Sequence, residues 1–90
     1  MKLTIATSSY TIDLEFPELS PPVKAKLLYF LMSECIEKIE LTPTLFLERR
    51  ERDVGEYYRF PRPIWFSPCE GIELLLEKEE IEQFILLLQE

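Results

Sequence analysis

Residues 10 to 16 alternate strictly between apolar and polar side chains, and this pattern places the tightest limit on the fold. The apolar positions are Tyr10, Ile12, Leu14 and Phe16. Because successive side chains of a strand point to opposite faces, the two-residue period predicts a half-buried β-strand. Leu3 and Ile5 repeat the period before the polar Thr7-Ser8-Ser9. Residues 2 to 16 therefore predict a β-hairpin; one long bent strand is the alternative, since the turn has no glycine.

A helical period follows this hairpin. Ser20 suits the N-cap position, and Pro21 suits the first helical position, where no amide donor is needed. From there, apolar side chains recur at spacings of three and four: Leu28, Leu31, Met32, Cys35, Ile36 and Ile39. The spacing predicts a helix from about residue 21 to residue 40, with Cys35 as an inert thiol on its apolar stripe.

The middle of the chain predicts two strands joined by a hairpin loop. Leu45-Phe46-Leu47 begins a strand that becomes charged toward its end. Asp53-Val54-Gly55 suits a three-residue loop, because glycine readily adopts the left-handed conformation that such loops need. The returning strand, residues 56 to 66, contains Pro61 and Pro63, which lack amide donors. We therefore expect this strand to lie at a sheet edge or to break at the prolines.

The last quarter of the chain predicts a strand and a helix after the turn-forming Ser67-Pro68-Cys69-Glu70-Gly71. Ile72, Leu74 and Leu76 occupy alternate positions and predict a fifth strand over residues 72 to 76, although a helix from Glu70 onward is the alternative. A face with helical spacing then predicts a helix over about residues 79 to 89. This face consists of Ile81, Phe84, Ile85 and Leu88.

The order of the predicted elements defines the fold class. It is β-β-α-β-β-β-α, which indicates one small α+β domain covering residues 1 to 90. We expect an antiparallel or mixed sheet of about five strands, with both helices on one of its faces.

The amino-acid composition excludes several chemistries. The chain has no histidine, so a Ser-His or Cys-His nucleophile would lack its general base. Gly55 and Gly71 are the only glycines and lie too far apart for a phosphate-binding loop. A zinc site needs about four Cys or His ligands, whereas the chain has two cysteines. We therefore expect no enzyme activity, no cofactor and no bound metal.

The net charge and the length of the apolar runs limit the partners and the cellular location that we expect for the protein. The net charge of −7 argues against a globally basic nucleic-acid binder. The longest apolar run, Leu27 to Met32, has six residues, whereas a membrane-spanning helix needs about 20. The first residues also lack the apolar core of a secretory signal. We therefore expect a cytoplasmic protein without membrane contact.

Arginine is confined to one stretch of the chain. All five arginines lie between positions 49 and 62, and all five lysines lie outside. Residues 48 to 62 have five positive and four negative charges, a net charge of +1. Because the whole chain has a net charge of −7, the remaining residues together have a net charge of −8. Guanidinium groups stack on aromatic rings, and Arg, Tyr and Trp are enriched at binding hot spots. The candidate partner-binding residues are Arg49, Arg50, Arg52, Tyr57, Tyr58, Arg59, Arg62 and Trp65.

Two simpler interpretations apply to the same residues. An exposed hairpin often has opposite charges that pair across its strands, such as Arg52 with Glu56, each pair contributing a fraction of a kcal/mol. The favoured interpretation of Trp65 is a core anchor, and an exposed aromatic platform is the alternative.

The leading functional interpretation is a small acidic, non-catalytic protein-binding or regulatory module that acts through the hairpin at residues 48 to 66. Its partner is another protein, and spare apolar side chains suggest a homodimer: Leu27, Phe30, Leu86 and Leu87. The alternative is an inhibitor or modulator of a nucleic-acid-binding machine, by acidic mimicry or by direct single-strand contact. Acidic residues interspersed among the arginines argue against direct binding of nucleic acid.

Overall fold

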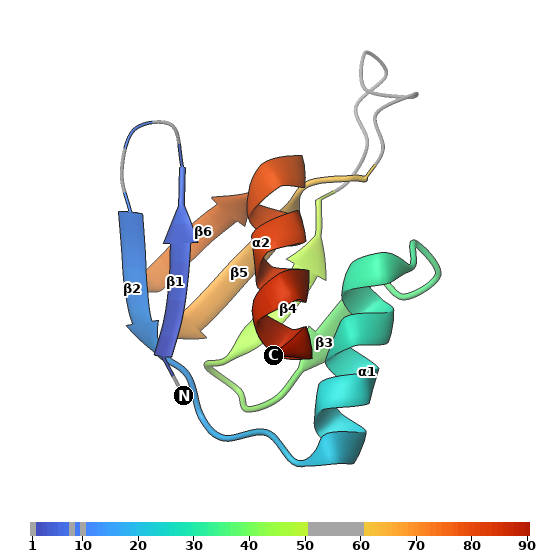
Figure 1. The fold of residues 1–90 in the computed structure, drawn as a ribbon. Coiled ribbons are helices and arrows are strands. Elements are labelled where there is room, and N and C mark those ends of the chain that lie inside the picture. Colours follow the sequence, from blue (N-terminus) through green and yellow to red (C-terminus); the bar gives the residue numbers. More distant parts are fainter. Residues whose placement is uncertain (1, 8, 10, 51–60) are drawn as a thin grey trace.

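The computed structural model describes residues 2–7, 9, 11–50 and 61–90 (Figure 1). Its elements are β1 (Lys2–Ala6), β2 (Thr11–Glu15), α1 (Pro21–Met32), β3 (Lys38–Glu40), β4 (Phe46–Arg49), β5 (Ile64–Cys69), β6 (Ile72–Leu76) and α2 (Lys78–Gln89). The strands form two antiparallel sheets, β1-β2 and β3-β4-β5-β6. The α+β fold class is confirmed, with six strands in the described part of the chain instead of about five.

The predicted N-terminal hairpin is confirmed. β1 pairs antiparallel with β2, and Leu3 lies opposite Leu14 while Ile5 lies opposite Ile12. Leu3 and Ile5 are fully buried, as the two-residue period requires. The hairpin is joined to α2 through Gln83, whose Oε1 accepts from the Ala6 amide at 2.8 Å and whose Nε2 donates to the Ala6 carbonyl at 2.6 Å.

The first helix is shorter than its spacing predicts. α1 ends at Met32, Ser33 is extended, and residues 38 to 40 form β3. Ile39 is buried opposite Leu47 of β4, and Cys35 is exposed rather than part of the core. The prediction failed here because residues at a spacing of three or four can continue a helix or enter a strand after a short connection.

The turn predicted at residues 67 to 71 is also shorter than expected. β5 continues to Cys69, and the turn consists of Glu70 and Gly71, which has a φ of 83°. The β5-β6 ladder shifts register between Phe66 and Cys69. This irregularity accommodates Pro68, which has no amide to donate.

Of the remaining element predictions, some are confirmed and the others lie outside the described residues. β6 and α2 confirm the strand at residues 72 to 76 and the helix over residues 79 to 89. The predicted loop at 53 to 55, and the returning strand as far as Phe60, lie outside the described residues.

Both helices lie on the same side of the four-stranded sheet, and the core fills the space between them (Figure 1). Three aromatic rings connect its layers: Phe16 after β2, Phe66 in β5 and Phe84 in α2. Their centroids lie 6.1 Å apart for Phe16 and Phe66, 5.8 Å for Phe16 and Phe84, and 5.4 Å for Phe66 and Phe84. Of the described helices, neither has the length and apolar character that crossing a membrane requires.

Candidate protein-contact surface

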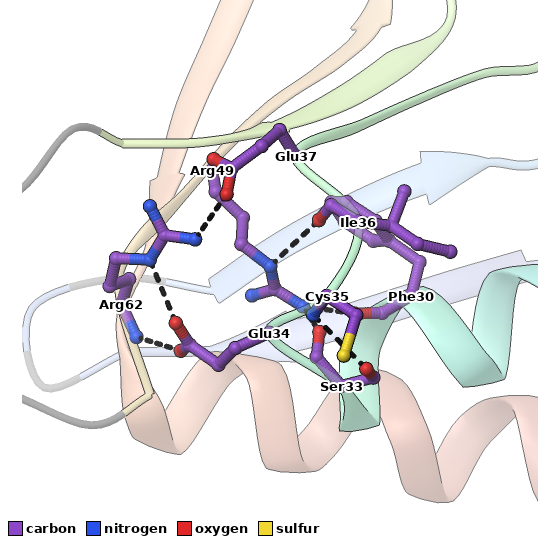
Figure 2. A network of polar contacts seen from close by, with 8 residues as sticks. All are labelled: Phe30, Ser33, Glu34, Cys35, Ile36, Glu37, Arg49 and Arg62. Atoms are coloured by element: carbon purple, nitrogen blue, oxygen red, sulfur yellow. Dashed lines mark hydrogen bonds and ion pairs between the residues drawn. The ribbon is translucent and has the colours of Figure 1, made fainter.

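Four of the eight contact residues predicted from the sequence lie in the described part of the chain. Arg49, Arg50, Arg62 and Trp65 belong to the described chain, whereas Arg52, Tyr57, Tyr58 and Arg59 lie outside the described residues. Arg49 and Arg62 donate to groups of this same chain, as shown in Figure 2. Arg50 is half-buried, and its amide donates to the Pro63 carbonyl at 2.9 Å. Trp65 is exposed on the sheet face that points away from the helices, so its interpretation as a core anchor is wrong.

Arg49 joins the end of β4 to the end of α1. Its side chain is buried, with 4% of the residue exposed, and its Nε donates to the Ile36 carbonyl at 3.0 Å. Its Nη2 donates to the carbonyls of Phe30 and Ser33, and the guanidinium carbon lies 4.7 Å from the centroid of the Phe30 ring. Its Nη1 has no hydrogen-bond partner among the described residues. One cation thus binds the carbonyls that α1 leaves unpaired where it ends.

This position is favourable for a positive charge. The carbonyls at a helix C-terminus carry partial negative charge, so a cation placed there stabilises the helix end. Burial lowers the pKa of the Arg49 guanidinium. The group remains a cation, because the arginine guanidinium is not deprotonated in proteins.

Arg62 holds the connection between α1 and β3. Its amide and its Nε donate to the two oxygens of Glu34 at 2.8 and 2.7 Å, and its Nη2 donates to Glu37 Oε1 at 2.7 Å. The hydrogen bonds with Glu37 and Glu34 raise the pKa of Arg62, and the bond from Arg62 lowers the pKa of Glu37. The Arg62 and Glu34 side chains are 13% and 19% exposed, whereas Glu37 is 67% exposed. The pairing therefore fixes the 33 to 37 connection on the sheet.

The four-stranded sheet has a second face, which neither helix covers. A row of four side chains in register crosses its centre, one from each strand: Lys38, Glu48, Trp65 and Leu75. Their neighbours Leu47, Ile64 and Leu76 point the other way and are buried. We call the following residues the outer sheet face: Lys38, Glu40, Phe46, Glu48, Trp65, Glu73 and Leu75. Trp65 lies at the centre of the outer sheet face and is 39% exposed.

Charge is unevenly neutralised on the outer sheet face. The Lys38 Nζ lies 3.7 Å from a Glu40 oxygen, 3.9 Å from a Glu48 oxygen and 4.7 Å from the centroid of the Phe46 ring. A cavity of about 370 Å³ opens between the β3-β4 and β5-β6 connections, with Phe46, Glu70 and Glu73 among its lining residues. No lysine or arginine of the described chain lines this cavity, and none forms an ion pair with Glu70 or Glu73.

Sequence reasoning missed part of this surface. Phe46, Glu73 and Leu75 were assigned only to strands, although alternation carried the necessary signal. Once Leu47 is placed in the core, its neighbours Phe46 and Glu48 must point outward together. What alternation does not give is the strand order that places Phe46 and Leu75 on either side of β5.

Comparisons with protein-family models, curated proteins and solved structures found no match. Within the described residues, no three His, Cys, Asp or Glu side chains converge in a way that could hold a metal ion. Both cysteines, Cys35 and Cys69, are free and exposed.

The apolar side chains that suggest a homodimer differ in how far they are exposed. Leu27 and Phe30 are fully buried, Leu87 is half-buried, and Leu86 is 63% exposed. The homodimer stays a prediction.

Proposed function

We propose that this protein is a small acidic, non-catalytic module that binds another protein and regulates it. The contact surface consists of the outer sheet face and of the segment from residue 48 to residue 66 that adjoins it through Glu48 and Trp65. Arg49 and Arg62 of this segment are not part of the surface, because their guanidinium groups bind groups of this same chain.

The exposure of Trp65 is the observation that supports this proposal most directly. Its ring lies in the middle of β5, between two paired strands, so binding would cost little conformational entropy. Tryptophan is enriched at binding hot spots, where truncation to alanine costs about 2 kcal/mol or more. The half-buried Leu75 and Phe46 beside it supply apolar area for a partner.

Replacing Trp65 by alanine tests the proposal. The immobilised protein should lose its specific partner from a cell lysate, with the affinity of the isolated pair reduced about 30-fold. Tyr29→Ala is the matched control, because Tyr29 is an aromatic residue of α1 that is 56% exposed and distant from this face. Partner capture that is equal for the two variants would contradict the proposal.

The arginine part of the surface needs a separate variant. Alanine at Arg50, Tyr58 and Arg59 together should weaken capture of the same partner while the circular dichroism spectrum stays native. Unchanged capture would remove the segment from 48 to 66 from the proposed surface and leave the outer sheet face alone.

A second candidate is an inhibitor of a nucleic-acid-binding machine, favoured by the net charge of −7. Acidic mimicry predicts that the protein displaces labelled oligonucleotide from the machine without binding the oligonucleotide itself. Direct binding of a single strand would instead appear at low salt and weaken steeply as salt rises.

A further inference from the structure

The distribution of charge on the outer sheet face indicates what kind of partner it fits. In the β3-β4 half, Lys38 lies within 4 Å of both Glu40 and Glu48, and these three side chains together have one net negative charge. Between the β3-β4 and β5-β6 connections, Glu70 and Glu73 line a cavity whose lining includes no lysine or arginine of the described chain. Binding a cation there would bring together unlike charges, whereas binding an anion would bring together like charges.

The cavity has room for one long side chain. Its volume of about 370 Å³ exceeds that of an arginine or lysine side chain, and Phe46 provides an apolar wall for the methylene stem. Gly71 leaves the rim open, because a Cβ placed on it would meet no atom within 4 Å.

The cavity and Trp65 belong to one surface. Phe46 lies opposite Ser67 in the ladder, and Glu48 lies opposite Trp65. Phe46 and Trp65 are therefore diagonal neighbours, with their Cα atoms roughly 7 to 8 Å apart. An extended partner segment can place one side chain in the cavity and the side chain two residues along on the Trp65 ring, because alternate side chains share a face.

We infer that the outer sheet face docks a basic segment of the protein partner, with an arginine or lysine in the cavity lined by Glu70 and Glu73 and an apolar side chain on Trp65. This inference rests on the proposed function and adds the chemistry of the partner.

Trp65 provides the measurement, since it is the only tryptophan in the chain. The probe repeats Arg-Ser-Leu-Ser, which places arginine and leucine on one face of an extended chain (the Arg-Leu peptide), and the comparison peptide repeats Glu-Ser-Leu-Ser (the Glu-Leu peptide). Titration with the Arg-Leu peptide should shift the Trp65 emission and should weaken as salt rises. The Glu-Leu peptide should leave the emission unchanged.

Paired variants then localise the binding. Glu70→Gln with Glu73→Gln should weaken the Arg-Leu peptide about tenfold, as expected for the loss of two ion pairs. Glu82→Gln with Glu90→Gln removes the same amount of charge from two exposed residues, one within α2 and one at its C-cap, both outside the cavity. This control pair should bind as the native chain does.

The outcomes separate the two proposals. The inference would be overturned if the Arg-Leu peptide did not bind or if both peptides bound equally. It would also be overturned if both variant pairs weakened binding of the Arg-Leu peptide equally. If Trp65→Ala still abolishes capture of the natural partner, the proposed function stands while the basic partner does not. If neither Trp65→Ala nor the Glu70 and Glu73 variants affect capture, both proposals fail.

Discussion

Arg49 is a charged residue on a sheet face that is otherwise apolar, and its neighbours explain why it is there. The Phe30, Ser33 and Ile36 carbonyls that it binds would otherwise be poorly satisfied beside the core. In the sequence, Arg49 looks like any other member of the arginine cluster. Its role depends on a contact between the ends of α1 and β4, and local sequence does not specify which distant carbonyls an arginine meets.

We predict that Arg49→Met lowers the free energy of unfolding by about 2 to 4 kcal/mol, because it leaves several partly buried carbonyls without donors. Arg49→Lys should recover only part of this loss, since one ammonium group cannot reproduce the planar fork of a guanidinium. Urea denaturation followed by circular dichroism measures both. A loss below about 0.5 kcal/mol for the methionine variant would contradict the proposed capping role.

Glu37 gives a prediction for pH. The hydrogen bond from Arg62 lowers the pKa of Glu37 in the folded state, so the ionised carboxylate stabilises the fold above the unfolded value of about 4.3. The native chain should melt at a higher temperature than Glu37→Gln at neutral pH. The difference should disappear as pH falls through the folded pKa of Glu37. Melting curves from about pH 7 to pH 3 measure it, and a constant difference would refute the assignment.

At the scale of elements, local patterns predict structure where each element fits one period. The alternation of β1 and β2 and the helical face of α2 meet this condition, and all three were found as expected. The region from Ser33 to Glu40 does not, because it suits both a helix and a strand. Its conformation is fixed by Arg49 and Arg62, which come from distant positions in the chain.

The turn between β5 and β6 depends on Gly71, whose φ of 83° is unfavourable for other residues. Open space surrounds a Cβ at this position, so a substitution there costs backbone energy without a clash. Gly71→Ala should lower the free energy of unfolding by about 1 to 2 kcal/mol, and Gly71→Asn by less, because asparagine tolerates this conformation better. Urea denaturation measures both variants. Equal stability of Gly71→Ala and the native chain would contradict this account.

At the scale of the whole molecule, the two faces of the four-stranded sheet have different roles. The inner face contributes Leu47, Ile64 and Phe66 to the core, and the outer face presents Trp65 among charged groups. The sequence predicted the type and approximate position of most elements, although not β3, and it includes Trp65 among the candidate contact residues. The grouping of Trp65 with Phe46, Glu73 and Leu75 required the strand order, which depends on contacts distant in sequence.

Gln83 has a consequence for how the molecule opens. Its side-chain amide forms hydrogen bonds with both the amide and the carbonyl of Ala6, as a neighbouring strand would. These two bonds connect the N-terminal hairpin to α2. The Ala6 amide should therefore exchange with deuterium at the rate at which α2 detaches, and not at the rate of a fraying terminus. The beginning and the end of the chain would then unfold together as one cooperative unit.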